Sequence, residues 1–182
     1  MERSVIKRYT IKFKGLKAGE HTFQFKVDEA FFAEFDKSHV SSGDIEVQVV
    51  LVKHTNMLNL RFSIEGTADV PCDRCLEFFA IPLEYSGEVI IKISDSTPEE
   101  YSDEIWSIGS NEHEVNIAQY LYESICLSLP IQRYHGILGT SADDCDFEMI
   151  SKLNKLAPNA EAPDKKEETD SRWDKLKGLM NN

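Results

Sequence analysis

The central part of the chain alternates apolar and polar residues with a period of two. Between Gly43 and Ser94 apolar side chains recur at every second position, as in the run Leu60, Phe62 and Ile64. This period is typical of half-buried β-strands, and turn-forming residues separate the runs. We therefore predict an α+β protein, built mainly on an antiparallel β meander that forms a sandwich or a partial barrel.

Two earlier segments show the same period. The opening residues 4–16 alternate apolar and basic side chains and predict a half-buried strand, and residues 21–27 predict a second strand with Phe23, Phe25 and Val27 on one face. Residues 95–114 are acidic and have little periodicity, so we expect a mobile loop there.

Two to four helices should accompany the strands. Asp28 is a suitable N-cap for a short helix, and residues 146–156 have the pattern of another. Asn116 can cap a longer helix that ends before Pro130. Five apolar residues of this helix share one stripe and should pack against the sheet: Ile117, Tyr120, Leu121, Ile125 and Leu129.

Composition divides the chain into four segments. Residues 1–134 form the predicted β-rich core domain, and residues 135–156 form a cysteine- and histidine-containing segment with a short helix. Residues 157–169 are rich in Pro, Ala and charge and predict a flexible linker in the C-terminal tail. Residues 170–182 predict a docking helix with four contact residues: Arg172, Trp173, Leu176 and Leu179.

The negative charge is concentrated in the middle of the chain. The net charge is −12, and residues 61–134 carry four basic and fourteen acidic side chains. Nucleic-acid binding relies on Lys and Arg to displace counterions from phosphates, so this region would repel an RNA backbone. A large charged partner should therefore be basic, such as a basic protein.

Basic residues cluster in the N-terminal segment. Direct contact with RNA, if the protein makes one, is expected at four of these residues: Lys7, Arg8, Lys12 and Lys14. The alternative is that they form the solvated face of a strand.

No run of apolar residues approaches the length of a membrane span, and the first residues lack the apolar centre of a signal peptide. We expect a cytoplasmic protein that does not enter a membrane. In that compartment a close pair of cysteines favours a metal or redox site over a structural disulfide.

Such a pair occurs in the stretch D-V-P-C-D-R-C-L-E, where Cys72 and Cys75 stand between two predicted strands. A C-x2-C turn directs both sulfurs to one side, where they can bind one zinc ion. Downstream, His135 and Cys145 can complete a Cys3His set. Zinc is thus the one cofactor that the sequence suggests.

Two alternatives stay open. The turn can be an empty or partly bound site, with Arg74 making local contacts and His135 at the surface. It can also serve thiol–disulfide chemistry, although Asp69, Asp73 and Glu77 should then raise the pKa of a thiolate. Motifs of other enzyme classes are missing from the sequence, so we expect a protein without catalytic activity.

Three stretches together resemble the YceD family of bacterial and plastid proteins: V-P-C-D-R-C-L-E, V-N-I-A-Q-Y-L-Y-E-S-I-C-L-S-L-P-I and D-S-R-W-D-K-L-K-G-L. The similarity runs from about Val47 to Leu179 and puts Arg74, Leu76 and Glu77 in the family signature as partner-contact residues. Many members have further cysteines after the helix, whereas this chain offers His135 and Cys145.

The resemblance implies a non-enzymatic factor in ribosome biogenesis, needed for accumulation or processing of the large-subunit 23S rRNA. Its partner would be a precursor of the large ribosomal subunit. Together with the charge distribution, this suggests an acidic adaptor for a basic ribosomal protein. A direct rRNA-binding module is the alternative, and a thiol redox protein using Cys72 and Cys75 is a third.

Overall fold

A computed structural model describes residues 3–36, 38–94 and 105–157 of the chain. It divides into two compact units, residues 1–146 and residues 147–182. The predicted linker and docking helix, with Arg172, Trp173, Leu176 and Leu179, lie outside the described residues apart from Ala157.

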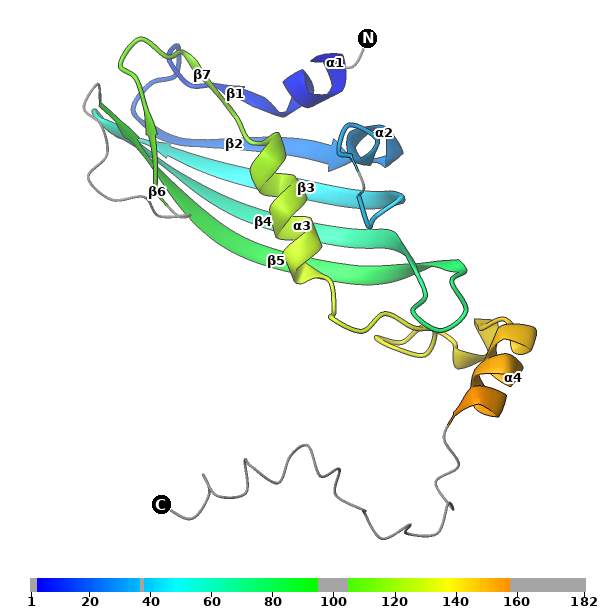
Figure 1. The fold of residues 1–182 in the computed structure, drawn as a ribbon. Helices are drawn as coiled ribbons and strands as arrows, with labels where there is room; N and C mark the ends of the chain where they lie inside the picture. Colours follow the sequence, from blue (N-terminus) through cyan, green and yellow to red (C-terminus); the bar gives the residue numbers. More distant parts are fainter. Residues whose placement is uncertain (1–2, 37, 95–104, 158–182) are drawn as a thin grey trace, which may run out of the picture. The chain divides into compact units, whose positions relative to one another are not determined.

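A five-stranded sheet forms the first unit (Figure 1). The strands follow the order of the chain: β2 (Gly19–Val27), β3 (Ser42–Lys53), β4 (Met57–Pro71), β5 (Phe78–Ile93) and β6 (Ile105–Ile108). Neighbours from β2 to β5 are antiparallel, while β6 runs parallel to β5. The α+β class is confirmed, and the meander takes the form of an open sheet.

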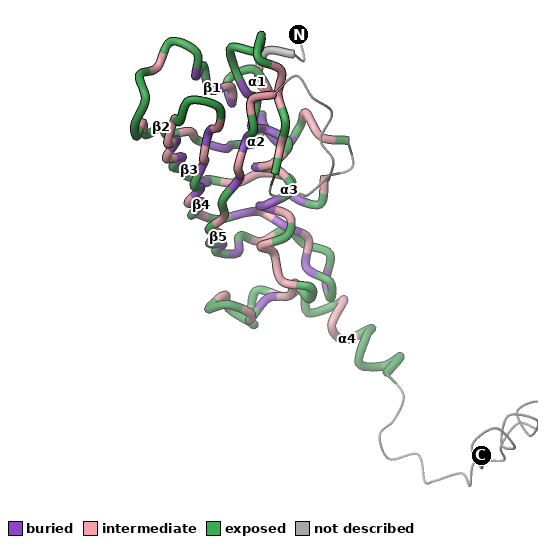
Figure 2. Tube along the Cα trace, turned by 90° about the vertical axis from the view of Figure 1, so that its left-hand side faces the viewer, coloured by how far each residue is buried: buried purple, intermediate pink, exposed green. Residues whose placement is uncertain are grey.

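One face of this sheet forms the core. Along β3 and β4 every second side chain is buried, which gives the alternation of buried and exposed positions along the trace in Figure 2. Val49, Leu51, Leu58 and Leu60 are fully buried. The remaining side chains of these strands lie on the opposite, outer face, because successive residues of a strand point to opposite sides.

The helix α3 (Ala118–Ser128) lies across the core face (Figure 1). Its stripe packs as predicted: Ile117, Leu121 and Ile125 are fully buried, and Tyr120 and Leu129 are partly buried against the core. The cap position itself is Ile117, one residue later than predicted, while the Asn116 side chain accepts a hydrogen bond from the Ala118 N–H at 3.0 Å.

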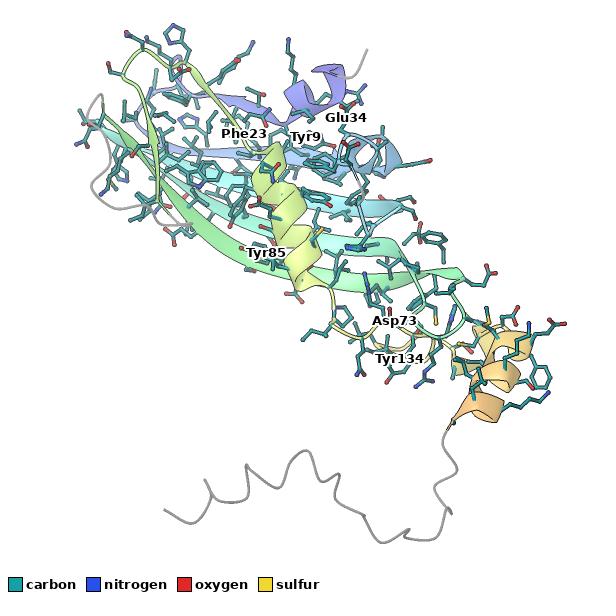
Figure 3. All side chains as sticks on the ribbon, viewed as in Figure 1. Tyr9, Phe23, Glu34, Asp73, Tyr85 and Tyr134 are labelled. Atoms are coloured by element: carbon teal, nitrogen blue, oxygen red, sulfur yellow. The ribbon has the colours of Figure 1, made fainter. Side chains whose placement is uncertain are left out.

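Asp28 caps a helix as predicted. Its carboxylate accepts a hydrogen bond from the Phe31 N–H at the start of α2 (Glu29–Phe32). Phe31 and Phe32 are buried, and the Tyr9 ring stands edge-on to Phe31 at 4.7 Å between ring centroids (Figure 3). These aromatic contacts close one end of the core.

The predicted N-terminal strand was wrong over most of its length. The segment forms α1 (Arg3–Ile6), the 3₁₀ helix η1 (Lys7–Tyr9) and only then β1 (Thr10–Lys12). β1 pairs with β7 (Glu114–Asn116) in a separate two-stranded sheet. Tyr9, Ile11 and Phe13 are buried in and around β1, so the period of two held there but did not extend over the helical turns before it.

The predicted loop over residues 95–114 was wrong at its C-terminal end. Residues 105–108 form β6, and β7 begins at Glu114. Both strands are short. β6 pairs with a parallel strand, and β7 pairs with a strand that is distant in the sequence, so no local pattern predicts them. Residues 95–104 lie outside the described residues.

The second unit begins with α4 (Phe147–Leu156), which confirms the short helix predicted there. No helix among the residues that the structure describes is long and apolar enough to cross a membrane.

Candidate metal centre

The turn between β4 and β5 holds Cys72 and Cys75 in a compact knuckle. The Leu76 N–H donates to the Cys72 carbonyl at 2.9 Å, and the Cys72 N–H donates to the Glu77 carbonyl at 2.9 Å. The Arg74 N–H also donates to the Cys72 Sγ at 3.4 Å. To close the turn, Leu76 takes a φ of 67°, a left-handed conformation that costs a non-glycine residue about 1–2 kcal/mol.

The chain after α3 returns to this turn and is fastened to it. The Asp73 N–H donates to the Arg133 carbonyl at 2.6 Å, and the Asp73 carboxylate accepts from the Arg133 N–H at 2.6 Å. The Arg74 guanidinium lies 4.0 Å from the centre of the Tyr134 ring, a cation–π contact. Figure 3 shows Asp73 and Tyr134 at this end of the β4–β5 hairpin.

These contacts bring four side chains with metal-binding atoms together. The Cys72 and Cys145 Sγ atoms are 3.9 Å apart. The Nδ1 atom of His135 is 3.5 Å from the Cys75 Sγ and 3.3 Å from the Cys145 Sγ. All four ligand atoms lie within 4.8 Å of one another.

The cluster is largely shielded from water. Cys72 is fully buried, and Cys75 and His135 are 4% and 5% exposed. The His135 ring packs on Phe79 at 4.5 Å between ring centroids, which holds the ring against the hairpin. His135 is therefore not at the surface, so the alternative was wrong on the place of this residue; binding of a metal stays a prediction.

The electrostatics of the cluster differ from the sequence-based prediction. Burial alone would raise the pKa of Cys72, but hydrogen bonds from the backbone N–H groups of Cys75 and Arg74 outweigh it and lower the pKa to about 6. The prediction that nearby carboxylates would raise the pKa was thus wrong for Cys72.

The pKa of Cys145 moves the other way. Burial, followed by the hydrogen bonds and negative charge of Cys72 and Cys75, raises it to about 11. Several thiolates cannot gather in this space without a compensating charge. A divalent cation would supply that charge, because a coordinating thiol is deprotonated.

The spacing of the ligand atoms fits zinc. With zinc–sulfur bonds of about 2.3 Å, a tetrahedral site places its sulfur atoms about 3.8 Å apart. The distances of 3.3 to 3.9 Å that join Cys145 to Cys72, and His135 to Cys75 and Cys145, are close to this value. Three thiols and one imidazole fill all four positions, which is typical of structural zinc sites rather than catalytic ones.

The structure thus brings together the four residues that the sequence suggested as metal ligands. Other predicted contact residues lie at the surface. In the signature, Leu76 is 66% exposed and Arg74 and Glu77 are also exposed, next to the cluster. The N-terminal basic residues are all exposed, at the helical turns and β1: Lys7, Arg8, Lys12 and Lys14.

Sequence analysis missed the residues that assemble the centre. Asp73, Arg133 and Tyr134 join its two halves, and Phe79 supports the histidine ring. Asp73 was considered only as a charge. Its position inside the C-x2-C turn was the one available signal, because side chains there tend to bond to nearby backbone groups.

The fold and the cluster define a class: an α+β protein with an open five-stranded sheet, whose longest hairpin supplies two ligands of a Cys3His cluster from its tip. Within that class the chain belongs to the YceD family. The family model, described as "Large ribosomal RNA subunit accumulation protein YceD", matches residues 60–180, which include all four cluster residues. Comparisons with curated proteins and with solved structures give no match.

Proposed function

We propose that this protein is a non-enzymatic factor in the accumulation of large-subunit 23S rRNA, and that it acts as an acidic adaptor for a basic ribosomal protein. The family description supports the link to the large ribosomal subunit. On this proposal the protein works in the cytoplasm, on a precursor of that subunit.

The observation that carries the adaptor role is the unbalanced negative charge of residues 61–134, which contain fourteen acidic and four basic side chains. Within the part of this segment that the structure describes, an ion pair engages only the carboxylate of Asp73. The remaining charges favour a cationic surface and oppose a polyphosphate.

Binding between ribosomal protein and adaptor should be tested by pull-down with the full-length protein, followed by a salt titration. We expect one or a few basic ribosomal proteins in the eluate, released as salt rises, because exposed charges are screened within about 10 Å at 0.1 M salt. Capture of naked rRNA with no ribosomal protein would contradict the adaptor role.

Direct binding of rRNA is the second candidate, favoured by the exposure of Lys7, Arg8, Lys12 and Lys14. The double variant Lys12→Glu and Lys14→Glu separates the two proposals. It should abolish RNA binding if these residues grip phosphates, and it should leave the capture of a basic protein nearly unchanged if the adaptor proposal is right.

We further propose that Cys72, Cys75, His135 and Cys145 hold a structural zinc ion. The ion would tie the segment after α3 to the β4–β5 turn and keep the exposed residues Arg74, Leu76 and Glu77 in place as a contact surface. The near-tetrahedral spacing and the closed ligand set support this role.

Elemental analysis of protein purified without an affinity tag tests the zinc site. We expect about one zinc per chain, lost in Cys72→Ser and kept in the matched control Cys126→Ser, because Cys126 lies in α3 outside the cluster. A metal-free protein with a disulfide between Cys72 and Cys75 would instead favour the thiol redox alternative.

A further inference from the structure

β5 has an unpaired edge over most of its length. On one side β5 pairs with β4 from Phe78 to Lys92. On the other side it pairs with β6 only from Ile90 to Ile93. Residues 78–89 therefore have no strand beside them on that side within the described part of the chain.

The hydrogen-bond pattern shows which backbone groups face this edge. The Ile93 N–H donates to the Asn56 carbonyl on the β4 side, and the Ser94 N–H donates to the Ile108 carbonyl after β6. In an antiparallel pair the direction alternates with every residue, and the register from Pro71↔Phe78 to Met57↔Lys92 has no interruption. Even-numbered residues of β5 thus direct their N–H and C=O groups to the free edge.

These residues are open to a partner. Ala80, Pro82, Glu84, Ser86 and Glu88 are all exposed. Proline lacks an N–H group and is tolerated in strands where that group would face solvent, which agrees with the place of Pro82 on this edge. Glu84, Ser86 and Glu88, three alternate residues of the strand, each offer both a donor and an acceptor at this edge.

The outer face beside this edge is strongly acidic. The registers align Glu46 with Glu65 and Glu65 with Glu84, so three glutamates stand side by side on β3, β4 and β5. Like charges directly opposite each other destabilise a sheet. Lys26, at the far end of the row, pairs with Asp44 at 2.8 Å, and no ion pair within the described residues engages the three glutamates.

The outer face of the sheet also has a depression, farther from the β5 edge. A depression of about 680 Å³ lies between β2 and β4, and its lining includes Lys26, Asp44, Glu46 and Glu65. Long cationic side chains from a strand next to β5 would point along the glutamate row toward this depression.

We infer that the free edge of β5 binds an extended, lysine- or arginine-rich protein segment as an added strand. Backbone groups of Glu84, Ser86 and Glu88 would pair with the segment, and every second side chain of the segment would meet the glutamate row. This inference rests on the proposed adaptor role and names the surface that would perform it.

Charge selects this occupant over two others. If a second copy of the chain paired at the same edge, the carboxylates of Glu84 and Glu88 would lie close to those of the other copy and repel them. Residues 95–104, which precede β6, contain five acidic residues and no basic residue, so they match the edge poorly. A basic segment in extended form is the complementary partner.

The test uses isothermal titration calorimetry with the full chain and a nine-residue peptide that alternates Lys and Val. We expect salt-sensitive binding in 1:1 ratio. The variant Ser86→Pro removes the outward N–H without taking a hydrogen bond from the β4 ladder, and it should weaken binding at least about tenfold, since every 1.4 kcal/mol is a factor of ten. Ser86→Ala keeps that N–H and should bind as the wild type does.

Charge reversals provide a second route if Ser86→Pro fails to fold. Glu84→Lys and Glu88→Lys should each weaken binding at least about tenfold, while the control Glu112→Lys, an equal charge change in the turn before β7, should change it less than about twofold. Equal effects of all three reversals would mean that the edge is not the site.

Four further probes decide the mode of binding. A peptide with its β5-facing amides N-methylated should not bind, and a peptide with the same composition in two blocks should bind weakly. If either binds as well as the alternating peptide, charge alone holds it and strand addition is wrong. A single-stranded RNA that displaces the peptide, or dimers of the free chain that Ser86→Pro dissolves, would also overturn the inference.

Pull-down of the basic ribosomal protein tests the adaptor role separately from the binding site on β5. If Ser86→Pro still captures the basic ribosomal protein in a pull-down, the inference about the edge fails and the adaptor role stands. If the wild type captures no such protein yet binds the peptide at this edge, the adaptor role fails and the binding site stands.

Discussion

Asp73 shows how one residue between two ligands can determine where the other two ligands lie. Its main chain and side chain both bond to Arg133, and His135 follows two residues later. The Arg133 guanidinium also lies 3.9 Å from the Asp73 carboxylate, with the Arg133 side chain 20% exposed. Residues behind the ligands of a metal site commonly affect its affinity 10–100-fold, so Asp73 belongs to the centre as much as the cysteines do.

Tyr9 gives a prediction about pH at the residue scale. Its hydroxyl donates to the Lys26 carbonyl at 2.8 Å, and burial, followed by the charge of Asp28, raises its pKa to about 12. The unfolded chain ionises near pH 10 while the folded chain does not. Stability from this group is therefore complete below pH 10 and is lost as pH rises toward 12.

The variant Tyr9→Phe should lose about 1 kcal/mol of unfolding free energy at pH 8, because the hydrogen bond is gone. At pH 11 the wild type should have lost about 1.4 kcal/mol that the variant keeps, so the difference disappears or reverses. Urea unfolding at both pH values measures this. A constant difference would show that Tyr9 ionises alike in both states.

At the scale of elements, α3 carries one leucine that packs in the core and another that is exposed to solvent. Leu121 is fully buried against the sheet, whereas Leu127, six residues later, is 82% exposed. Leu121→Ala should lower the free energy of unfolding by about 2–5 kcal/mol through lost burial and a cavity. Leu127→Ala should change it by less than about 0.5 kcal/mol.

Chemical denaturation of both variants checks this pair. If the cluster binds zinc as proposed, the same two proteins should keep it, because neither leucine belongs to the cluster. Equal losses of stability would mean that α3 does not dock on the sheet through the stripe that contains Ile117, Leu121 and Ile125.

Elements with a strong local signal could be predicted from the sequence. The period-two runs of β3, β4 and β5 and the capped stripe of α3 depend on residues that are close in the chain. β6 and β7 could not be predicted, because four and three residues carry little pattern and their pairing is set by tertiary contacts. For the same reason α1 and η1 were taken for a strand.

The candidate site, too, was predictable only where it depends on residues close in the sequence. Cys72 and Cys75 were recognisable from their spacing, and ligand chemistry alone suggested His135 and Cys145. The actual meeting of the two pairs depends on the Asp73–Arg133 bonds and on the His135–Phe79 contact. Those contacts join residues about sixty positions apart, and no sequence period reports them.

At the scale of the whole molecule, removal of metal should loosen one segment and leave the sheet intact. The sheet is held by burial and by the ladders from β2 to β5, whereas the segment that carries His135 and Cys145 returns to the hairpin through few contacts. We expect a chelator to leave the far-ultraviolet circular dichroism spectrum nearly unchanged.

Limited trypsin digestion locates the loosened segment. Cleavage after Arg133 should accelerate at least about tenfold with the chelator, since local opening governs proteolysis. Cleavage after Arg61 should stay slow, although its side chain is 56% exposed, because it lies within the central strand β4. Equal acceleration at both sites would mean that the metal supports the whole fold.

The spread of the four ligands along the chain has a consequence for biosynthesis. Cys72 and Cys75 leave the ribosome early, but Cys145 follows seventy-three residues behind Cys72. The β4–β5 hairpin can form as soon as its own residues emerge, because its contacts are local. During this interval the nascent chain exposes an incomplete thiol pair, so the centre can close only after Cys145 has also emerged.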